Sequence, residues 1–109
     1  ASYIDLVKGR NALIERAGRA TADFDAIAMP TLAIVAPPIA DFTGDREHWL
    51  AANALILRNT YVANFLDRPA ITLPCHPPGA GPVGLMLLGA TMGDAGLLRL
   101  AAGIEAALA

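Results

Sequence analysis

The chain has 109 residues, enough for one domain with a modest core. Its net charge of −2, without a basic cluster, argues against nucleic-acid binding, and its single cysteine excludes an internal disulfide framework. Apolar residues make up 55% of the sequence and charged residues 17%, where typical soluble domains have about 45–50% and about 25%. We therefore expect one apolar face to be buried against more of the same polypeptide, another subunit or a ligand.

The first predicted helix covers residues 3–22. Ser2 followed by Asp5 resembles a capping box, and apolar residues then recur near helical spacing. Charged residues interrupt the segment, so we do not expect a signal peptide. No run of 18 apolar residues occurs in the sequence, so we expect no membrane span and a cytoplasmic protein.

A short apolar run from Phe24 to Met29 predicts a buried strand with a parallel neighbour. Residues 30–45 contain three prolines and few helix signals, which predicts a long irregular connection. Connections of this kind in compact domains are often functional or lie over a site.

A long helix is predicted over residues 45–65, with Asp45 as its cap, and its apolar character on nearly every side predicts burial. On a wheel of about 100° per residue, Asn53, Thr60 and Asn64 share one stripe, with Leu57 beside them. Two interpretations stay open. These polar groups could bond neighbouring backbone in a larger core, or part of the stripe could line a substrate pocket.

Residues 70–73 and 83–88 predict two further strands, separated by a turn region at 79–82. A last helix is expected to begin with Asp94 as its cap. Its predicted buried stripe consists of Leu97, Ala101, Ile104 and Leu108. Together, these elements predict an α/β chain with about three strands and three helices.

Side chains with catalytic or metal-binding chemistry form no convincing group. Cys75 and His76 are neighbours in an extended segment and should point to opposite faces, which favours a packing cysteine beside a loop histidine over a nucleophile–base pair. His48 has no second ligand at metal-binding spacing, so we predict no metal site. The glycine-rich stretch 79–84 precedes a strand rather than a helix, so we do not expect a phosphate loop or a cofactor.

From Phe24 to Leu108, the chain resembles the C-terminal part of the amidase signature family. The helix from Tyr3 through Arg10 also fits. The other matching pieces are, in order, Phe24-Asp25-Ala26-Ile27-Ala28-Met29-Pro30-Thr31, Ala36-Pro37-Pro38-Ile39, Arg58-Asn59-Thr60 with Asn64, Pro69-Ala70-Ile71-Thr72-Leu73-Pro74, Gly81-Pro82-Val83-Gly84-Leu85 and the closing helix.

The resemblance implies that the complete protein is an amidase, a hydrolase of carbon–nitrogen bonds in amides. The family uses a Ser–Ser–Lys triad from an upstream segment rich in glycine and serine. Ser2 is the only serine of this chain and Lys8 the only lysine, so no such triad can be built from it. We expect residues 1–109 to form the C-terminal part of an amidase signature domain without the catalytic segment, and to be inactive alone.

The resemblance further implies that this part is a fragment of a large mixed β-sheet covered by helices and forms one wall of the substrate channel. It places Thr60 and Ala63 near that channel. With the neighbouring positions added, the candidate substrate-binding residues are Leu57, Thr60, Ala63 and Asn64. No residue of the chain is assigned a catalytic role.

The tRNA-dependent amidotransferase subunits of the family tend to have an aspartate near position 57. Apolar Leu57 instead favours a general amidase acting on an uncharged or apolar acyl group. The expected partners are the remainder of the polypeptide and a small-molecule amide, with a homodimer as a further option. The alternative is a non-catalytic binding or assembly module with the same fold.

Overall fold

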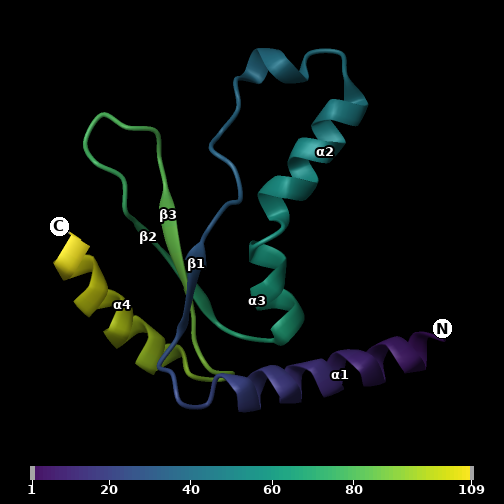
Figure 1. The fold of residues 1–109 in the computed structure, drawn as a ribbon, viewed down its shortest axis with the longest axis vertical. Helices are drawn as coiled ribbons and strands as arrows, with labels where there is room; N and C mark the ends of the chain where they lie inside the picture. The colour runs from purple at the N-terminus through teal and green to yellow at the C-terminus, as the bar shows by residue number, and fades with distance from the viewer. Residues whose placement is uncertain (1, 109) are drawn as a thin grey trace.

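A computed structural model describes residues 2–108, and these form an α/β fold, as predicted (Figure 1). The elements are α1 (Tyr3–Ala20), β1 (Ile27–Pro30), the 3-10 helix η1 (Ile39–Phe42), α2 (Arg46–Leu57), α3 (Thr60–Leu66), β2 (Ala70–Pro74), β3 (Gly84–Leu88) and α4 (Asp94–Leu108). Four α-helices replace the three that were expected, because the long second helix is divided.

The three strands form one sheet in the order β1-β3-β2, and β3 is antiparallel to both neighbours. The prediction that the first strand has a parallel neighbour is therefore wrong for residues 2–108. β1 and β2 do run in the same direction, but β3 lies between them. The apolar run does contain a strand, but it covers Ile27–Pro30 and none of its four residues is buried, so the expected burial is also wrong. Apolar composition contains no information about which segment pairs with the strand.

Successive residues of β3 face the two sides of the sheet, and each side packs against a helix. Leu87 joins Leu73 of β2 and Leu97 and Ala101 of α4 in one buried cluster. Met86, Leu88 and Ala63 of α3 form the second cluster on the opposite side. Figure 1 shows α4 and α3 on the two sides of the strands. The sheet is thus the middle layer of three.

The stripe predicted for α4 is confirmed at Leu97 and Ala101, which are buried, while Ile104 is half-buried and Leu108 remains 47% exposed. Asp94 is the first residue of α4 rather than its cap. The helix begins one residue earlier than a capping aspartate would require, because the amide of Leu97 already bonds the Gly93 carbonyl.

The single helix predicted over residues 45–65 is wrong in two respects. Asp45 does cap α2, by accepting from the amide of His48. However, the amides of Arg58 and Val62 bond carbonyls three residues back, at 3.4 and 3.0 Å, so the α-helical ladder is interrupted at the junction. The expected burial is also not found, because α2 has no buried residue among those described.

Helix α1 begins with the predicted capping box between Ser2 and Asp5, and it ends at Ala20, two residues earlier than expected. It packs against α3, and Arg10, near its middle, makes part of this contact: the Arg10 guanidinium donates to the Asn64 carbonyl at 3.3 Å and lies over the Phe65 ring. Its N-terminal end projects away from the rest of the chain (Figure 1).

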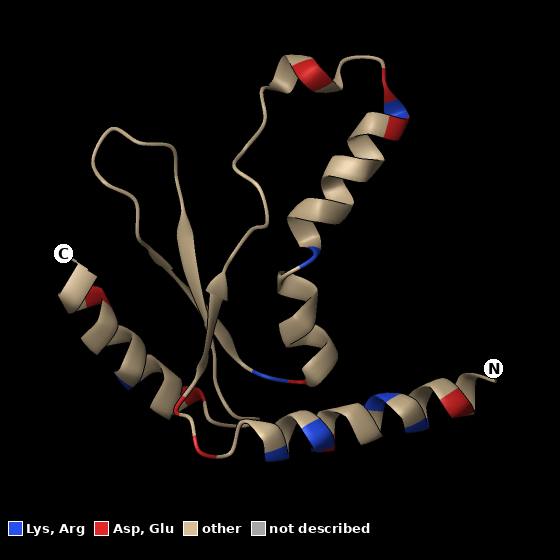
Figure 2. Cartoon of the chain, in the orientation of Figure 1, with Lys and Arg blue, Asp and Glu red and all other residues tan. Residues whose placement is uncertain are grey.

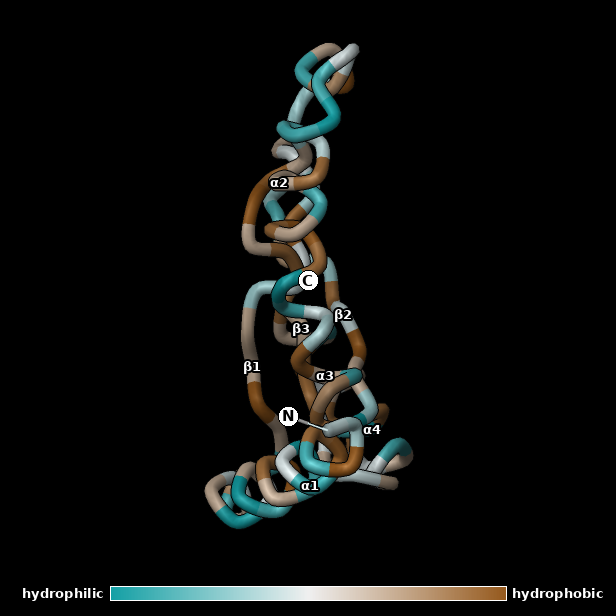
Figure 3. The backbone as a smooth tube through the Cα atoms, turned by 90° about the vertical axis from the view of Figure 1, so that its right-hand side faces the viewer, coloured by the Kyte–Doolittle hydropathy of each residue, from teal (hydrophilic) through white to brown (hydrophobic). Residues whose placement is uncertain are grey.

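The fold is open and flat. Its dimensions are 45 × 43 × 18 Å and its radius of gyration is 16.8 Å, where a compact domain of this length has about 13 Å. Figure 3 shows the thin edge of the molecule, with hydrophobic segments along both the helices and the strands. The accessible surface is 7814 Å², about 2,100 Å² more than a compact 11.3 kDa protein exposes. No helix within residues 2–108 is long and apolar enough to cross a membrane.

Candidate functional site

The candidate residues Leu57 and Thr60 lie on either side of the α2–α3 junction, and both are half-buried. The Thr60 hydroxyl donates to the Leu57 carbonyl at 3.0 Å. This bond uses the hydroxyl proton within the helix and leaves the oxygen's lone pairs free to accept from another group. The junction therefore presents one apolar and one accepting side chain next to each other.

Ala63 and Asn64 lie one turn further along α3 and have different surroundings. Ala63 is only 5% exposed and packs between the helix and Met86 and Leu88 of β3. Asn64 is exposed, and its carbonyl accepts from Arg10. Asn53, the third member of the predicted stripe, lies on α2. Because the helix is interrupted between Asn53 and Thr60, a single helical wheel no longer applies, and Asn53 is not related to Thr60 and Asn64 as members of one stripe.

A residue that sequence reasoning left without a role connects this junction to the sheet. The side-chain amide of Asn59 donates to the carbonyl of Pro30, the last residue of β1, at 2.7 Å. Asparagine is disfavoured inside helices because its amide competes for backbone partners. The same preference applies to Asn53, which lies inside α2 without a break, so the asparagine alone did not locate the junction.

Two threonines and a glycine complete the end of the sheet beside this contact. The Thr31 hydroxyl donates to the Thr72 hydroxyl at 3.2 Å, and the Thr31 amide donates to the Gly84 carbonyl at 2.9 Å. A Cβ on Gly84 would come within 2.6 Å of Thr72 and 2.7 Å of Thr31. The glycine thus permits the two threonine side chains to close over the start of β3.

The remaining candidates do not form a reactive centre. Cys75 and His76 are both exposed, and both contact the main chain of Val83, at 3.6 Å from sulfur and 3.3 Å from Nδ1. The cysteine is therefore not the packing residue that we expected. The His48 ring lies 5.5 Å from the Phe42 ring. Within residues 2–108, no three His, Cys, Asp or Glu side chains are grouped so that they could hold a metal ion.

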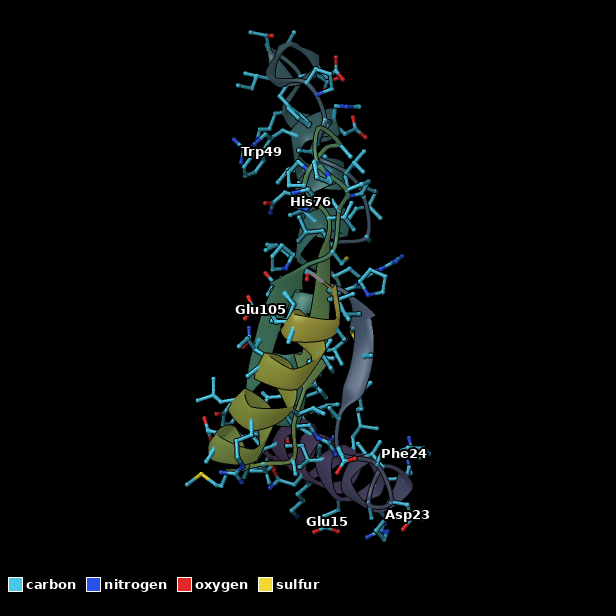
Figure 4. The ribbon with its side chains drawn as sticks, turned by 90° about the vertical axis from the view of Figure 1, so that its left-hand side faces the viewer. Glu15, Asp23, Phe24, Trp49, His76 and Glu105 are labelled. Carbon is cyan, nitrogen blue, oxygen red and sulfur yellow. The ribbon has the colours of Figure 1, made fainter. Side chains whose placement is uncertain are left out.

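The surroundings of the junction are almost free of charge. Figure 2 shows no acidic or basic residue on the strands or along α3, with charges on α1, at the start of α2, on α4 and around the loops. Arg58 is the charged residue at the junction itself, and it is exposed. Figure 4 shows Trp49 and His76 towards the far end of the molecule from Asp23 and Phe24. An environment with so little charge suits an uncharged ligand.

These groups can bind and orient a ligand, but they offer no activated nucleophile. Hydroxyl and amide groups of Thr60, Thr31, Thr72 and Asn59 supply hydrogen bonds, and no histidine, carboxylate or lysine lies in hydrogen-bond contact with any of them within residues 2–108. Nucleophilic catalysis needs a base within hydrogen-bond reach of the nucleophile. These groups therefore offer hydrogen bonds to a ligand but no nucleophilic chemistry.

Comparisons with known proteins assign this chain to a family. The sequence model described as Amidase matches residues 1–98. A 2-amino-5-chloromuconic acid deaminase from Comamonas testosteroni is 35% identical over 102 residues, which cover 89% of this chain and 22% of that protein. A fatty acid amide hydrolase from Oryza sativa subsp. indica is 39% identical over 85 residues, covering 74% of this chain and 14% of the enzyme.

The fold is also similar to that of a solved structure. A glutamyl-tRNA(Gln) amidotransferase subunit from Thermotoga maritima superimposes with a TM-score of 0.71 at 26% identity, over 89% of this chain and 21% of the matched protein. The chain thus spans 14–22% of the length of these three proteins. It belongs to the amidase signature family, as the resemblance implied.

Proposed function

We propose that this chain serves in an amide hydrolase, as the C-terminal part of an amidase signature domain whose other parts supply the catalytic groups. The observation that carries the proposal is the family match over residues 1–98. Ser2 and Lys8, the only serine and lysine, lie at the cap and in the second turn of exposed helix α1 and cannot build a Ser–Ser–Lys triad. We expect the chain to be inactive without the remaining parts.

The open shape supports a role within a larger domain. The chain exposes about 2,100 Å² more surface than a compact protein of its mass, and apolar residues are exposed on α1, α2 and α3. Both features are expected of a part of a larger core that has lost its cover. Tyr3, Ile4, Trp49, Tyr61 and Phe65 are among these side chains. The remainder of the polypeptide is the proposed cover, and a homodimer contact and a cytoplasmic location remain predictions.

Within this proposal, the α2–α3 junction forms part of the substrate wall, with Leu57, Thr60 and Asn64 lining it and Ala63 holding α3 against the sheet. The sparsely charged surroundings and apolar Leu57 favour an amide with an uncharged or apolar acyl group. The 39% identity to a fatty acid amide hydrolase agrees with an apolar acyl group. The chain is also similar to a glutamyl-tRNA(Gln) amidotransferase subunit, so amidotransferase activity of the complete protein is the competing outcome that the test must distinguish.

The test is Thr60→Leu in the complete protein, assayed on a panel of amides with short, long, neutral and charged acyl groups. We expect the ratio of kcat/KM values between apolar and polar acyl groups to change by about 10-fold or more, because a polar wall position becomes apolar. Thr43→Leu is the matched control, since the Thr43 hydroxyl also donates to a carbonyl three residues back, at 2.7 Å, in the loop region.

An unchanged ratio for Thr60→Leu would count against the wall assignment. A complete protein that hydrolyses no amide of the panel, yet self-associates through its apolar surface, would favour the alternative of a non-catalytic assembly module. Preferred hydrolysis of glutamine with transfer of the ammonia would favour the amidotransferase activity.

A further inference from the structure

We infer that Asn59 is a positioning residue, whose hydrogen bond to the end of β1 sets the placement of Leu57 and Thr60 and thereby the acyl preference. This inference rests on the proposed function of the junction as a substrate wall. Asn59 does not itself need to touch the substrate.

The contact joins two points that are 29 residues apart in sequence. The Nδ2 atom of Asn59 donates to the Pro30 carbonyl at 2.7 Å, near the short end of the range for such bonds. The Pro30 carbonyl is itself held in place, because the following amide, that of Thr31, donates to the Gly84 carbonyl of β3. The side-chain amide therefore bonds to a rigid part of the sheet.

Other contacts of the two helices do not replace this anchor. Helix α3 is held against the sheet by Ala63 and, less completely, by Val62. Helix α2 has no buried residue, and its most extensive packing within residues 2–108 is against η1. The direction in which α2 leaves the junction is therefore determined close to Asn59. Figure 1 shows α2 inclined away from α3 at this point.

Leu57 and Thr60, the two candidate wall residues, are close enough to Asn59 in the chain to move if its hydrogen bond is lost. Leu57 precedes Asn59 by two residues and Thr60 follows it directly, and the bond from the Thr60 hydroxyl to the Leu57 carbonyl crosses the junction. If the anchor is lost, α2 can rotate about the junction and carry the Leu57 side chain with it. Displacements of about 1 Å in a substrate wall alter selectivity, because reactivity depends on orientation.

The chemistry of the contact predicts an order of effects. Asn59→Ala removes the donor and leaves the Pro30 carbonyl without this partner. Asn59→Asp keeps the shape but places a carboxylate oxygen against a carbonyl oxygen, so two acceptors face each other and repel. The aspartate variant should therefore perturb the junction more than the alanine variant, although it is closer in size.

The experiment compares these variants with Thr21→Val in the complete protein. Thr21→Val removes two hydrogen bonds of similar length at the end of α1, one from Arg68 to the Thr21 hydroxyl and one from that hydroxyl to the Ala17 carbonyl, both at 2.8 Å. The first readout is the ratio of kcat/KM for a long-chain over a short-chain amide. We expect about a fivefold change for Asn59→Ala, the equivalent of one hydrogen bond, and a larger change for Asn59→Asp. Thr21→Val should leave the ratio within about twofold.

The second readout is hydrogen exchange, which does not depend on activity. Asn59→Ala should increase exchange across residues 46–66 while β3 keeps its wild-type protection, and Thr21→Val should not. Unchanged hydrogen exchange in both Asn59 variants would overturn the proposal that Asn59 anchors the junction. An unchanged kcat/KM ratio in these variants, or an equal change of that ratio in Thr21→Val, would overturn the role of Asn59 in acyl preference. If the wild-type protein hydrolyses no amide, the proposed function fails, and the exchange result alone decides whether Asn59 anchors the junction.

Discussion

Replacing Gly84 with alanine is expected to lower the free energy of unfolding by about 1–2 kcal/mol, because the new methyl group has no space. Gly84 begins β3, and Thr31 and Thr72 lie directly over it. An added Cβ would lie 2.6 Å from the Thr72 Cγ2 atom and 2.7 Å from the Thr31 Oγ1 atom. Both neighbours must move, or the strand must shift.

The magnitude follows from two opposing effects. An ordinary contact starts near 3.4 Å, so the Thr72 methyl must retreat by about 0.8 Å, and such overpacking costs about 1–3 kcal/mol. The threonine side chain is stiff at χ1 and cannot rotate away freely. Against this, alanine restricts the unfolded chain more than glycine does, which stabilises by about 0.5–1 kcal/mol. The destabilising effect is larger.

Urea denaturation of the variants measures this difference. Gly81→Ala is the matched control, since a Cβ there meets nothing within 4 Å, and its stability should be equal to that of the wild type or slightly higher. Thr72→Ser in the Gly84→Ala background removes the clashing methyl and keeps the hydroxyl, so it should restore about 1 kcal/mol. A Gly84→Ala protein as stable as wild type, or no recovery in the double variant, would refute the reasoning.

Three further predictions concern packing, a helix end and a cap. Leu87→Ala should cost about 2–5 kcal/mol in urea denaturation, because Leu87 is 2% exposed, whereas Leu98→Ala at 58% exposed should cost less than about 1 kcal/mol. Asp67 follows α3 in the left-handed region, at φ 57°. Asp67→Gly should therefore stabilise the protein by about 0.5–1 kcal/mol in the same assay, and Asp67→Ala should destabilise it. Hydrogen bonds from the Ser2 backbone amide and then the Ser2 hydroxyl hold the pKa of Asp5 below its usual 3.8, so the stability that Asp5 contributes is present above that pH and is lost as the pH falls through the lower folded pKa. Ser2→Ala should raise the pKa of Asp5 in an NMR titration, and an unchanged pKa would contradict this.

Elements with strong local signals were predictable from the sequence. The capping box of Ser2 and Asp5 identified the start of α1, and the turn-rich stretch before Val83 identified the turn between β2 and β3. In these cases, the residues that fix the structure are close together in sequence. Local hydrogen bonds and turn geometry then suffice to locate the element.

The division of the long helix and the pairing of β1 were not predictable, because both depend on distant partners. The break between α2 and α3 is accompanied by the contact between Asn59 and Pro30, which are separated by 29 residues. β1 finds β3 rather than β2 although β2 comes earlier in the chain. Apolar composition shows that a segment is suited to burial, but does not identify the segment that covers it.

Only part of the candidate site could be predicted, because some of its residues are brought together by contacts between distant parts of the sequence. Thr60 was identified through the helical wheel and the family resemblance, and Leu57 as its neighbour on the wheel. The structure places them next to each other at the junction, and their role in a substrate wall stays a prediction. Asn59 lies between them in the same motif but received no role, because its partner could be found only in three dimensions. The cluster of Thr31, Thr72 and Gly84 was missed because each residue is unremarkable alone.

The size of the uncovered surface discriminates between the kinds of partner first considered for the apolar face. A stable interface between separate proteins buries about 800 Å² on each partner, whereas this chain exposes about 2,100 Å² more than a compact protein of 11.3 kDa. A small ligand or a transient protein partner would cover only part of that excess. Coverage of this extent is typical of a permanent core, in which the folding of both sides is coupled. This extent agrees with the proposal that the remainder of one amidase signature domain covers the apolar face, and an obligate homodimer, whose interface buries about 1,000–2,500 Å² on each chain, stays a prediction beside it.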